Sequence, residues 1–117
     1  MIIGIGARRG VTRQEALEAI EKALLEVGRD IDSVDMLASA KLKENETGLL
    51  EAADSLGIEI KFIPHDVLNT YEAPSASQAS RFGLTGVAEP SALALSENKE
   101  LILRKKVYGR ITIAIAE

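Results

Sequence analysis

The sequence predicts an α/β domain with three layers, α/β/α, in which helices cover both faces of a mixed β-sheet. Apolar strand-like segments alternate with amphipathic helical segments through the first half of the chain, which is typical of parallel strands joined by helices. Two further strand-like segments surround a short turn near the C-terminus and indicate an antiparallel hairpin. At 117 residues the chain has the usual size of one domain, so we expect residues 1–117 to share a single core.

The first strand and the first helix carry the clearest local signals. Residues 2–5 form an apolar strand-like run, after which the chain enters a glycine-rich turn. Thr12 and Glu15 have the spacing of a capping box, which predicts that a helix begins at residue 13. Apolar residues at helical spacing continue to Val27, and Gly28 is a typical residue for the turn that ends a helix.

The later elements follow from the same reasoning about periodicity, glycines and prolines. We expect strands at residues 34–40, 58–63, 101–106 and 110–116, and helices at residues 47–56, 66–71, 75–82 and 86–96. In the last strand Ile111, Ile113 and Ile115 share one face, while Ala114 and Ala116 share the other. The small alanine side chains predict that a helix packs closely on their face.

The turn after the first strand combines the features of an anion site. Gly6 and Gly10 would let a ligand approach the backbone, and N–H groups at the start of a helix favour negative charge. Arg8 and Arg9 add two guanidinium groups, whose planar forks match carboxylates and phosphates. The glycine spacing is one residue longer than the dinucleotide fingerprint, and no Gly-Lys-Ser/Thr phosphate-binding sequence follows. A tight turn with solvated arginines is the alternative explanation.

Further charged residues are expected at the same edge, because open α/β sheets bind ligands beyond the carboxyl ends of their parallel strands. Lys43 after the second strand and Lys105 in the hairpin are candidate secondary contacts, and His65, the single histidine, follows the third strand. Glu89, in the first turn of a helix, is a candidate base, although the helix dipole alone explains an acid there. For Arg110 the simplest role is to keep a charged edge hairpin soluble.

Composition argues against several other functions. The formal net charge of -4 disfavours general nucleic-acid binding, which needs a dominant basic face. The chain has no cysteine and one histidine, so we expect no cofactor or metal held by protein ligands. No apolar run approaches the length of a membrane span and no targeting segment is recognisable, so we expect a cytoplasmic protein that does not bind membranes.

Four segments that span nearly the whole chain carry a family resemblance when they are taken together. They are the glycine–arginine turn, Leu42-Lys43-x-x-Glu46-x-Gly48-Leu49, Gly86-Val87-Ala88-Glu89-Pro90-x-Ala92-Leu93 and Lys105-Lys106-x-x-Gly109-Arg110-Ile111-Thr112. In this order they resemble the C-terminal domain of the cobalamin biosynthesis protein CbiG and the equivalent stand-alone CobE proteins.

The resemblance implies a role in making the corrin ring. CbiG is the cobalt-precorrin-5A hydrolase, which opens the ring-A δ-lactone and releases acetaldehyde, so the expected ligand is a cobalt-precorrin intermediate carrying many acetate and propionate groups. Cobalt is then expected to arrive inside the macrocycle. The resemblance covers only the C-terminal domain of the hydrolase, so a separate N-terminal CbiG-type domain and other pathway enzymes are candidate partners.

Three functions remain open on this basis. The first is binding of a cobalt-precorrin and action in or with lactone hydrolysis, and the second is a non-catalytic carrier or partner module for corrin intermediates. The third, suggested by the residues without the resemblance, is a small domain that binds a phosphorylated metabolite. For the first function the candidate roles are substrate binding by Gly6, Arg8, Arg9, Gly10, Lys43 and Lys105, and catalysis by Glu89.

Overall fold

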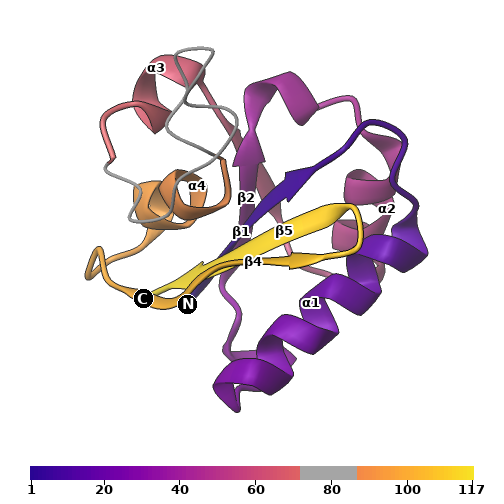
Figure 1. Cartoon of the computed structure of the whole chain (residues 1–117), viewed down its shortest axis with the longest axis horizontal. Coiled ribbons are helices and arrows are strands. Elements are labelled where there is room, and N and C mark those ends of the chain that lie inside the picture. The colour runs from indigo at the N-terminus through magenta and orange to yellow at the C-terminus, as the bar shows by residue number, and fades with distance from the viewer. Residues whose placement is uncertain (72–86) are drawn as a thin grey trace.

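The computed structural model of the chain describes residues 1–71 and 87–117. Its centre is a five-stranded mixed sheet with the strand order β3-β2-β1-β5-β4 (Figure 1). β1 pairs in parallel with β2 and β2 in parallel with β3, whereas β5 runs antiparallel to β1 and to β4. The strands are β1 (Ile2–Ala7), β2 (Met36–Ala40), β3 (Ile60–Ile63), β4 (Leu101–Tyr108) and β5 (Ile111–Ala116).

Helices cover both faces of the sheet, so the predicted three-layer architecture is confirmed. α1 (Arg13–Val27) and α2 (Thr47–Leu56) lie on one face, and α3 (His65–Leu68) and α4 (Ala88–Leu95) lie on the other (Figure 1). Two short 3-10 helices, η1 (Ile31–Ser33) and η2 (Lys41–Lys43), flank β2. None of the helices within the described ranges is long and apolar enough to cross a lipid bilayer.

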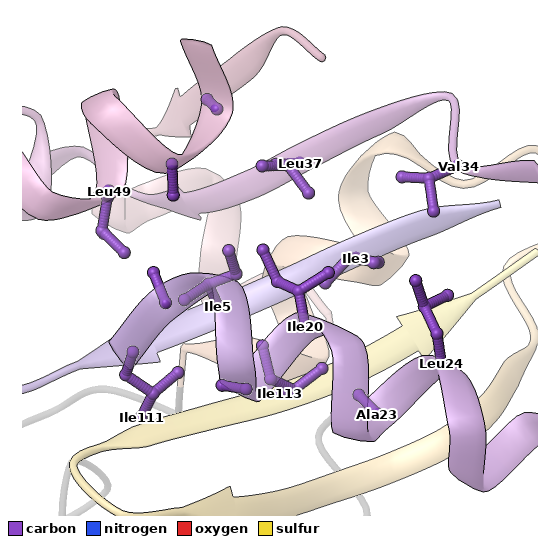
Figure 2. Packing of buried hydrophobic residues seen from close by; sticks show 14 of the residues in the cluster. Ile3, Ile5, Ile20, Ala23, Leu24, Val34, Leu37, Leu49, Ile111 and Ile113 are labelled. Carbon is purple, nitrogen blue, oxygen red and sulfur yellow. The ribbon is translucent and has the colours of Figure 1, made fainter. Parts of the chain in front are cut away.

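Strand alternation divides the buried side chains into two clusters. The cluster under α1 and α2 contains the isoleucines at the odd-numbered positions of β1 and β5, which pack against Ile20 of α1 and Leu49 of α2 (Figure 2). The cluster under α3 and α4 contains smaller residues of the sheet, among them Ala38 and Ala116, with Leu68 of α3. This division follows from the two-residue period of a strand.

The small-residue face allows a very close approach between α4 and β1, as the alanines of the last strand predict. A Cβ atom added to Gly4 would lie 2.0 Å from the carbonyl oxygen of Ala88 and 2.8 Å from the amide nitrogen of Ala92. Backbone therefore packs on backbone at this point, and a methyl group would not fit. The first glycine of the glycine-rich segment makes room for a helix.

The predicted boundaries are correct for α1 and α2, where capping box and terminal glycines give local signals. β1 extends to Ala7 instead of ending at residue 5, because all six of its residues pair with β5. β4 continues to Tyr108 because Gly109 and Arg110 alone form the hairpin turn. The other predicted elements within the described residues are shorter by one to three residues at one or both ends, except that α3 begins one residue earlier than predicted, at His65. The helix predicted at residues 75–82 lies outside the described residues.

The two ends of the chain lie side by side (Figure 1), because Ile2 of β1 pairs with Ala116 of β5. The amino group of Met1 donates a hydrogen bond to the Ser33 carbonyl oxygen, 3.0 Å away. At the other terminus, the Glu117 amide donates to the Glu100 carbonyl oxygen at 2.8 Å. Both chain ends are therefore at the opposite end of the sheet from the carboxyl ends of β1, β2 and β3.

Candidate functional site

Three loops meet at the carboxyl ends of the parallel strands, where the sequence predicts a ligand site. They are residues 8–10 after β1, residues 41–46 after β2 and residues 64–65 after β3, and we refer to them together as the carboxyl rim. Parallel neighbours in a sheet end at the same edge, which is why loops far apart in the sequence come together here. The β4–β5 turn joins the same edge, since the Arg8 amide donates to the Arg110 carbonyl oxygen at 3.1 Å.

The arginine turn differs from the predicted backbone cradle. The Arg8 amide is bound to Arg110, and the Gly10 amide donates to Glu46 Oε1 at 3.0 Å, so these two N–H groups are engaged inside the protein. The Arg8 and Arg9 side chains are exposed, and neither guanidinium forms an ion pair within residues 1–71 and 87–117. The positive charge that this turn can offer to a ligand therefore comes from the Arg8 and Arg9 side chains.

Lys43 is connected to the arginine turn through Glu46. Its Nζ lies 3.8 Å from Glu46 Oε2, and the side chains of Lys43 and Glu46 are only 18% and 15% exposed. Because the other oxygen of Glu46 accepts the Gly10 amide, one carboxylate ties η2 to the turn after β1. The predicted contact residues Gly10 and Lys43 are thus brought together, and the charge of Lys43 is partly neutralised by its partner.

Arg110 acts as a clamp on the start of α1. Its guanidinium forms hydrogen bonds to both carboxylate oxygens of Glu15, with Nε 2.9 Å from Oε2, and Nη2 also contacts the Gly10 carbonyl oxygen at 3.3 Å. Glu15 completes the predicted capping box with Thr12 as well. The hydrogen bonds from Arg110 lower the pKa of the Glu15 carboxyl to about 2. Arg110 stands at the rim, but its charge is balanced by Glu15.

Glu89 and Lys105 form a separate group on the face covered by α4. Glu89 is 2% exposed, and its Oε2 accepts a hydrogen bond from the Lys105 backbone amide at 3.1 Å. The pairing of β4 with β5 shifts between Leu103 and Lys106, so Lys105 lies in a β-bulge. The buried carboxylate therefore satisfies an amide that the sheet ladder leaves out, which the sequence did not predict.

Gly6 lies within β1 and not in the turn, contrary to the predicted strand boundary. A Cβ atom added there would be 3.7 Å from Thr112 and from Val87, an ordinary van der Waals distance. Val87 directly precedes α4, so Gly6 faces the start of the helix that carries Glu89. Gly4, Gly6 and Gly10, the glycines in and before the arginine turn, consequently have different surroundings.

A cavity that the sequence did not predict opens at the carboxyl rim between η2 and α3. Its volume is about 200 Å³. Its lining comes from the ends of β2 and β3, from α3 and from the residue before α4, namely Ala40, Lys41, Leu42, Pro64, His65, Leu68 and Val87. Leu42, an apolar residue between two lysines, is 65% exposed. The only sequence signals for this cavity are the Pro64–His65 pair after β3 and this apolar residue in a charged loop.

Within the described residues no three histidine and carboxylate side chains lie close enough to hold a metal ion together. The described rim instead offers two unpaired guanidinium groups, a partly neutralised lysine and a small, mainly apolar cavity. Such a combination suits an organic anion with an apolar body better than an isolated phosphate, because a phosphate has no use for the apolar surface.

Comparison with known proteins gives a consistent picture. Residues 1–116 match the family described as "Cobalamin synthesis G C-terminus". A cobalt-precorrin-5A hydrolase of Priestia megaterium is 36% identical over 118 residues, which cover 99% of this chain and 32% of that protein. The chain therefore spans about a third of the length of this relative.

Two solved structures share the fold over nearly all of the chain. The crystal structure of CobE, a protein from the cobalamin biosynthetic pathway, matches with a TM-score of 0.85 and 36% identity. The matched region covers 97% of this chain and 86% of the CobE chain. The cobalamin biosynthesis protein chiG from Agrobacterium tumefaciens has a TM-score of 0.76 and 30% identity, with 97% and 94% covered. The mixed sheet with helices on both faces is therefore the fold of these proteins.

Proposed function

The chain belongs to the cobalamin synthesis G C-terminal family and is a cobalamin biosynthesis protein related to cobalt-precorrin-5A hydrolase, and from this premise we propose that it binds a polycarboxylate cobalt-precorrin intermediate. We further propose that it acts in or with opening of the ring-A δ-lactone of cobalt-precorrin-5A. The observation that carries the proposal is the pair of exposed, unpaired guanidinium groups of Arg8 and Arg9 at the carboxyl rim of the described chain.

The chemistry of the ligand explains why arginines are suited to this position. A macrocycle fringed with acetates and propionates presents several carboxylates, and each guanidinium fork binds one of them through two parallel hydrogen bonds. A single exposed ion pair contributes only about 0.2–1 kcal/mol. Recognition therefore needs several contacts, and Lys43 supplies a third, weaker one because Glu46 already balances its charge.

In lactone opening, water attacks the lactone carbonyl, the acyl C–O bond breaks, and the ring oxygen takes up a proton to become a hydroxyl. Acetaldehyde is released when this hydroxyl loses its proton and forms the aldehyde carbonyl as the C–C bond to the macrocycle breaks, which leaves the electron pair on the macrocycle. The hydrolytic step needs a base near the water and cations near the carbonyl oxygen. Glu89 is the candidate base, but its carboxylate is buried and bound to the Lys105 amide. We therefore propose that Glu89 acts by holding α4 against β4, while cationic side chains at the rim stabilise the developing negative charge.

A carrier or partner module is the second candidate function. It is favoured by the surroundings of Glu89, the candidate base, whose carboxylate is buried and accepts the Lys105 backbone amide. In this case the rim would bind the same ligand, and hydrolysis would need residues supplied by another domain or protein.

Anaerobic titration with cobalt-precorrin-5A, followed by absorbance and by acetaldehyde release, tests the proposal. The Arg8→Ala/Arg9→Ala double variant should weaken binding about tenfold, as expected for a loss near 1.4 kcal/mol. Arg104→Ala, which removes an exposed arginine from the edge strand β4, is the matched control and should bind as the unaltered protein does. Equal affinity of the double variant and the control would overturn the proposed site.

The same titration separates the candidate functions. Acetaldehyde release by the chain alone would establish a hydrolase. Binding without release, both alone and with the N-terminal part of the P. megaterium hydrolase added, would establish the carrier function. A phosphate ester that displaces the corrinoid more effectively than other corrinoids do would favour the phosphorylated-metabolite function.

A further inference from the structure

The 3-10 helix η2 exposes a large apolar side chain, that of Leu42, at the carboxyl rim. Leu42 is 65% exposed, while Ala38 and Ala40 of the preceding strand β2 are fully buried or nearly so. Single exposed leucines are common on protein surfaces and need no explanation by themselves. Leu42 differs because it also lines the cavity between η2 and α3, so its side chain extends an apolar hollow onto the surface.

The geometry of η2 divides its three side chains between two directions. A 3-10 helix has three residues per turn, so consecutive side chains point about 120° apart. Lys43 points to Glu46 and, through it, to the arginine turn. Lys41 and Leu42 line the cavity at the ends of β2 and β3. η2 is therefore the bridge between the arginine turn and the cavity.

The cavity combines an apolar wall with two polar side chains. Ala40, Pro64 and Leu68 provide apolar surface, whereas the exposed residues Lys41 and His65 add an ammonium group and a ring N–H donor. Its volume of about 200 Å³ is too small for a whole macrocycle, but it fits one edge of such a ring with a short substituent.

We propose that Leu42 supports the apolar face of the bound macrocycle, and that the cavity receives one edge of the ring with a carboxylate held by Lys41 and His65. This inference rests on the proposed function and assigns the orientation of its ligand. The ring lies across η2, with one edge at the Arg8–Arg9 turn and the opposite edge over the end of β3. Leu42, Lys41 and His65 are then substrate-binding residues.

Fluorescence titration with uroporphyrin, a tetrapyrrole whose side chains are all acetates and propionates, tests this orientation. Leu42→Ser should weaken binding about tenfold, because it removes the apolar surface that the bound ring would cover. Leu25→Ser is the matched control, since Leu25 is 74% exposed on α1, away from the rim, and it should leave the affinity unchanged. His65→Ala should weaken binding by a few fold, and circular dichroism should show the same fold for all variants.

Salt concentration distinguishes the apolar contribution of Leu42 to binding from the electrostatic contribution of Arg8 and Arg9. The effect of Leu42→Ser should persist in about 1 M salt, where charge interactions are screened, whereas the effect of Arg8→Ala/Arg9→Ala should shrink. If Leu42→Ser and His65→Ala bind as the control does while the arginine variant loses affinity, the proposed orientation is wrong and the proposed function stands. If the unaltered protein does not bind uroporphyrin, or the arginine variant binds equally well, both proposals fail.

Discussion

Gly4, Gly6 and Gly10 lie within seven residues of one another, and each has a different physical reason for being small. Gly4 admits the backbone of α4, because a Cβ atom at this position would collide with the Ala88 carbonyl oxygen. Gly10 has φ +82°, a backbone conformation that other residues adopt only under strain. Gly6 has neither constraint. The space beside its backbone is bordered by Val87 and could also admit a ligand.

Alanine substitutions separate these roles. Gly4→Ala should destabilise the protein by about 2 kcal/mol or more, because the new methyl group would collide with backbone that cannot move independently. Gly6→Ala should change stability by less than about 1 kcal/mol, since its Cβ meets ordinary contacts and alanine suits a strand slightly better. Urea unfolding of both variants provides the measurement, and equal destabilisation would contradict the described packing of α4.

The ion pair between Glu15 and Arg110 predicts a dependence of stability on acid. Arg110 lowers the pKa of Glu15 from 4.5 to about 2, so the charged form is favoured in the folded protein. A lowered pKa stabilises the fold above the ordinary value of 4.5, and this contribution disappears as the pH falls towards 2. Glu15→Gln should therefore flatten the fall of the melting temperature over this range. The change should be modest, because the pair is open to solvent.

At the scale of single elements, β4 is the most irregular part of the sheet. Its pairing with β5 shifts twice, between Leu101 and Leu103 and between Leu103 and Lys106. Bulges and charged residues on an edge strand discourage pairing with other molecules. The second bulge turns the Lys105 amide towards α4, where Glu89 accepts its hydrogen bond. A helix and an edge strand are thus joined through one buried carboxylate.

Substitution of Glu89 tests its role in this junction. Glu89→Ala should destabilise the protein by about 1–3 kcal/mol, because the part-buried Lys105 amide would lose the hydrogen bond that Glu89 accepts. Glu89→Gln retains an acceptor oxygen and should be less destabilising. Thermal unfolding measures both, with Arg104→Ala as the control, since Arg104 is exposed on the same strand and its substitution keeps both Glu89 and the Lys105 amide. A folded Glu89→Gln variant that binds a corrinoid normally but has lost acetaldehyde release would instead identify a base.

The elements that could be predicted from the sequence are those with local signals. α1 and α2 have their predicted bounds because a capping box and terminal glycines act within a few residues. The length of β1 could not be predicted in this way, because the pairing of Ala7 with Ile111 joins residues that are far apart in the sequence. The same reason applies to the Glu15–Arg110 pair, whose strength depends on the hairpin reaching the start of α1.

For the candidate site, the sequence predicts the edge of the sheet at which the loops meet, but not the contacts within it. The rule that ligands bind at the carboxyl ends of parallel strands places residues 8–10 and 41–46 at one edge, and they are in contact there through Glu46. Which amides are already used, and where a cavity opens, depends on side chains from several loops at once. For this reason the hydrogen bond between Glu89 and the Lys105 amide, beside the bulge, could not be predicted from the sequence.

At the scale of the whole molecule, the two faces of one sheet contribute side chains to the two buried hydrophobic clusters. Leu49 of α2 is 1% exposed in the first cluster, and Leu68 of α3 is fully buried in the second. Because neither cluster can lose its strands without exposing the other, we expect the chain to unfold in one cooperative transition.

Truncation of one leucine in each cluster tests this coupling. Leu49→Ala and Leu68→Ala should each cost about 2–5 kcal/mol, and each should shift a single calorimetric transition to lower temperature. The measured and van't Hoff enthalpies should agree for both variants. A second transition that moves with only one of the two substitutions would show that the faces unfold independently.

The neighbouring chain ends have a consequence for how this fold is used in larger proteins. Since Ile2 and Ala116 are paired, the domain could be spliced into a surface loop of a host protein, or have its order of segments permuted, with only a short added linker. In either arrangement the added linkers would lie at the end of the sheet opposite the carboxyl rim, away from Arg8 and Leu42 of the proposed binding site.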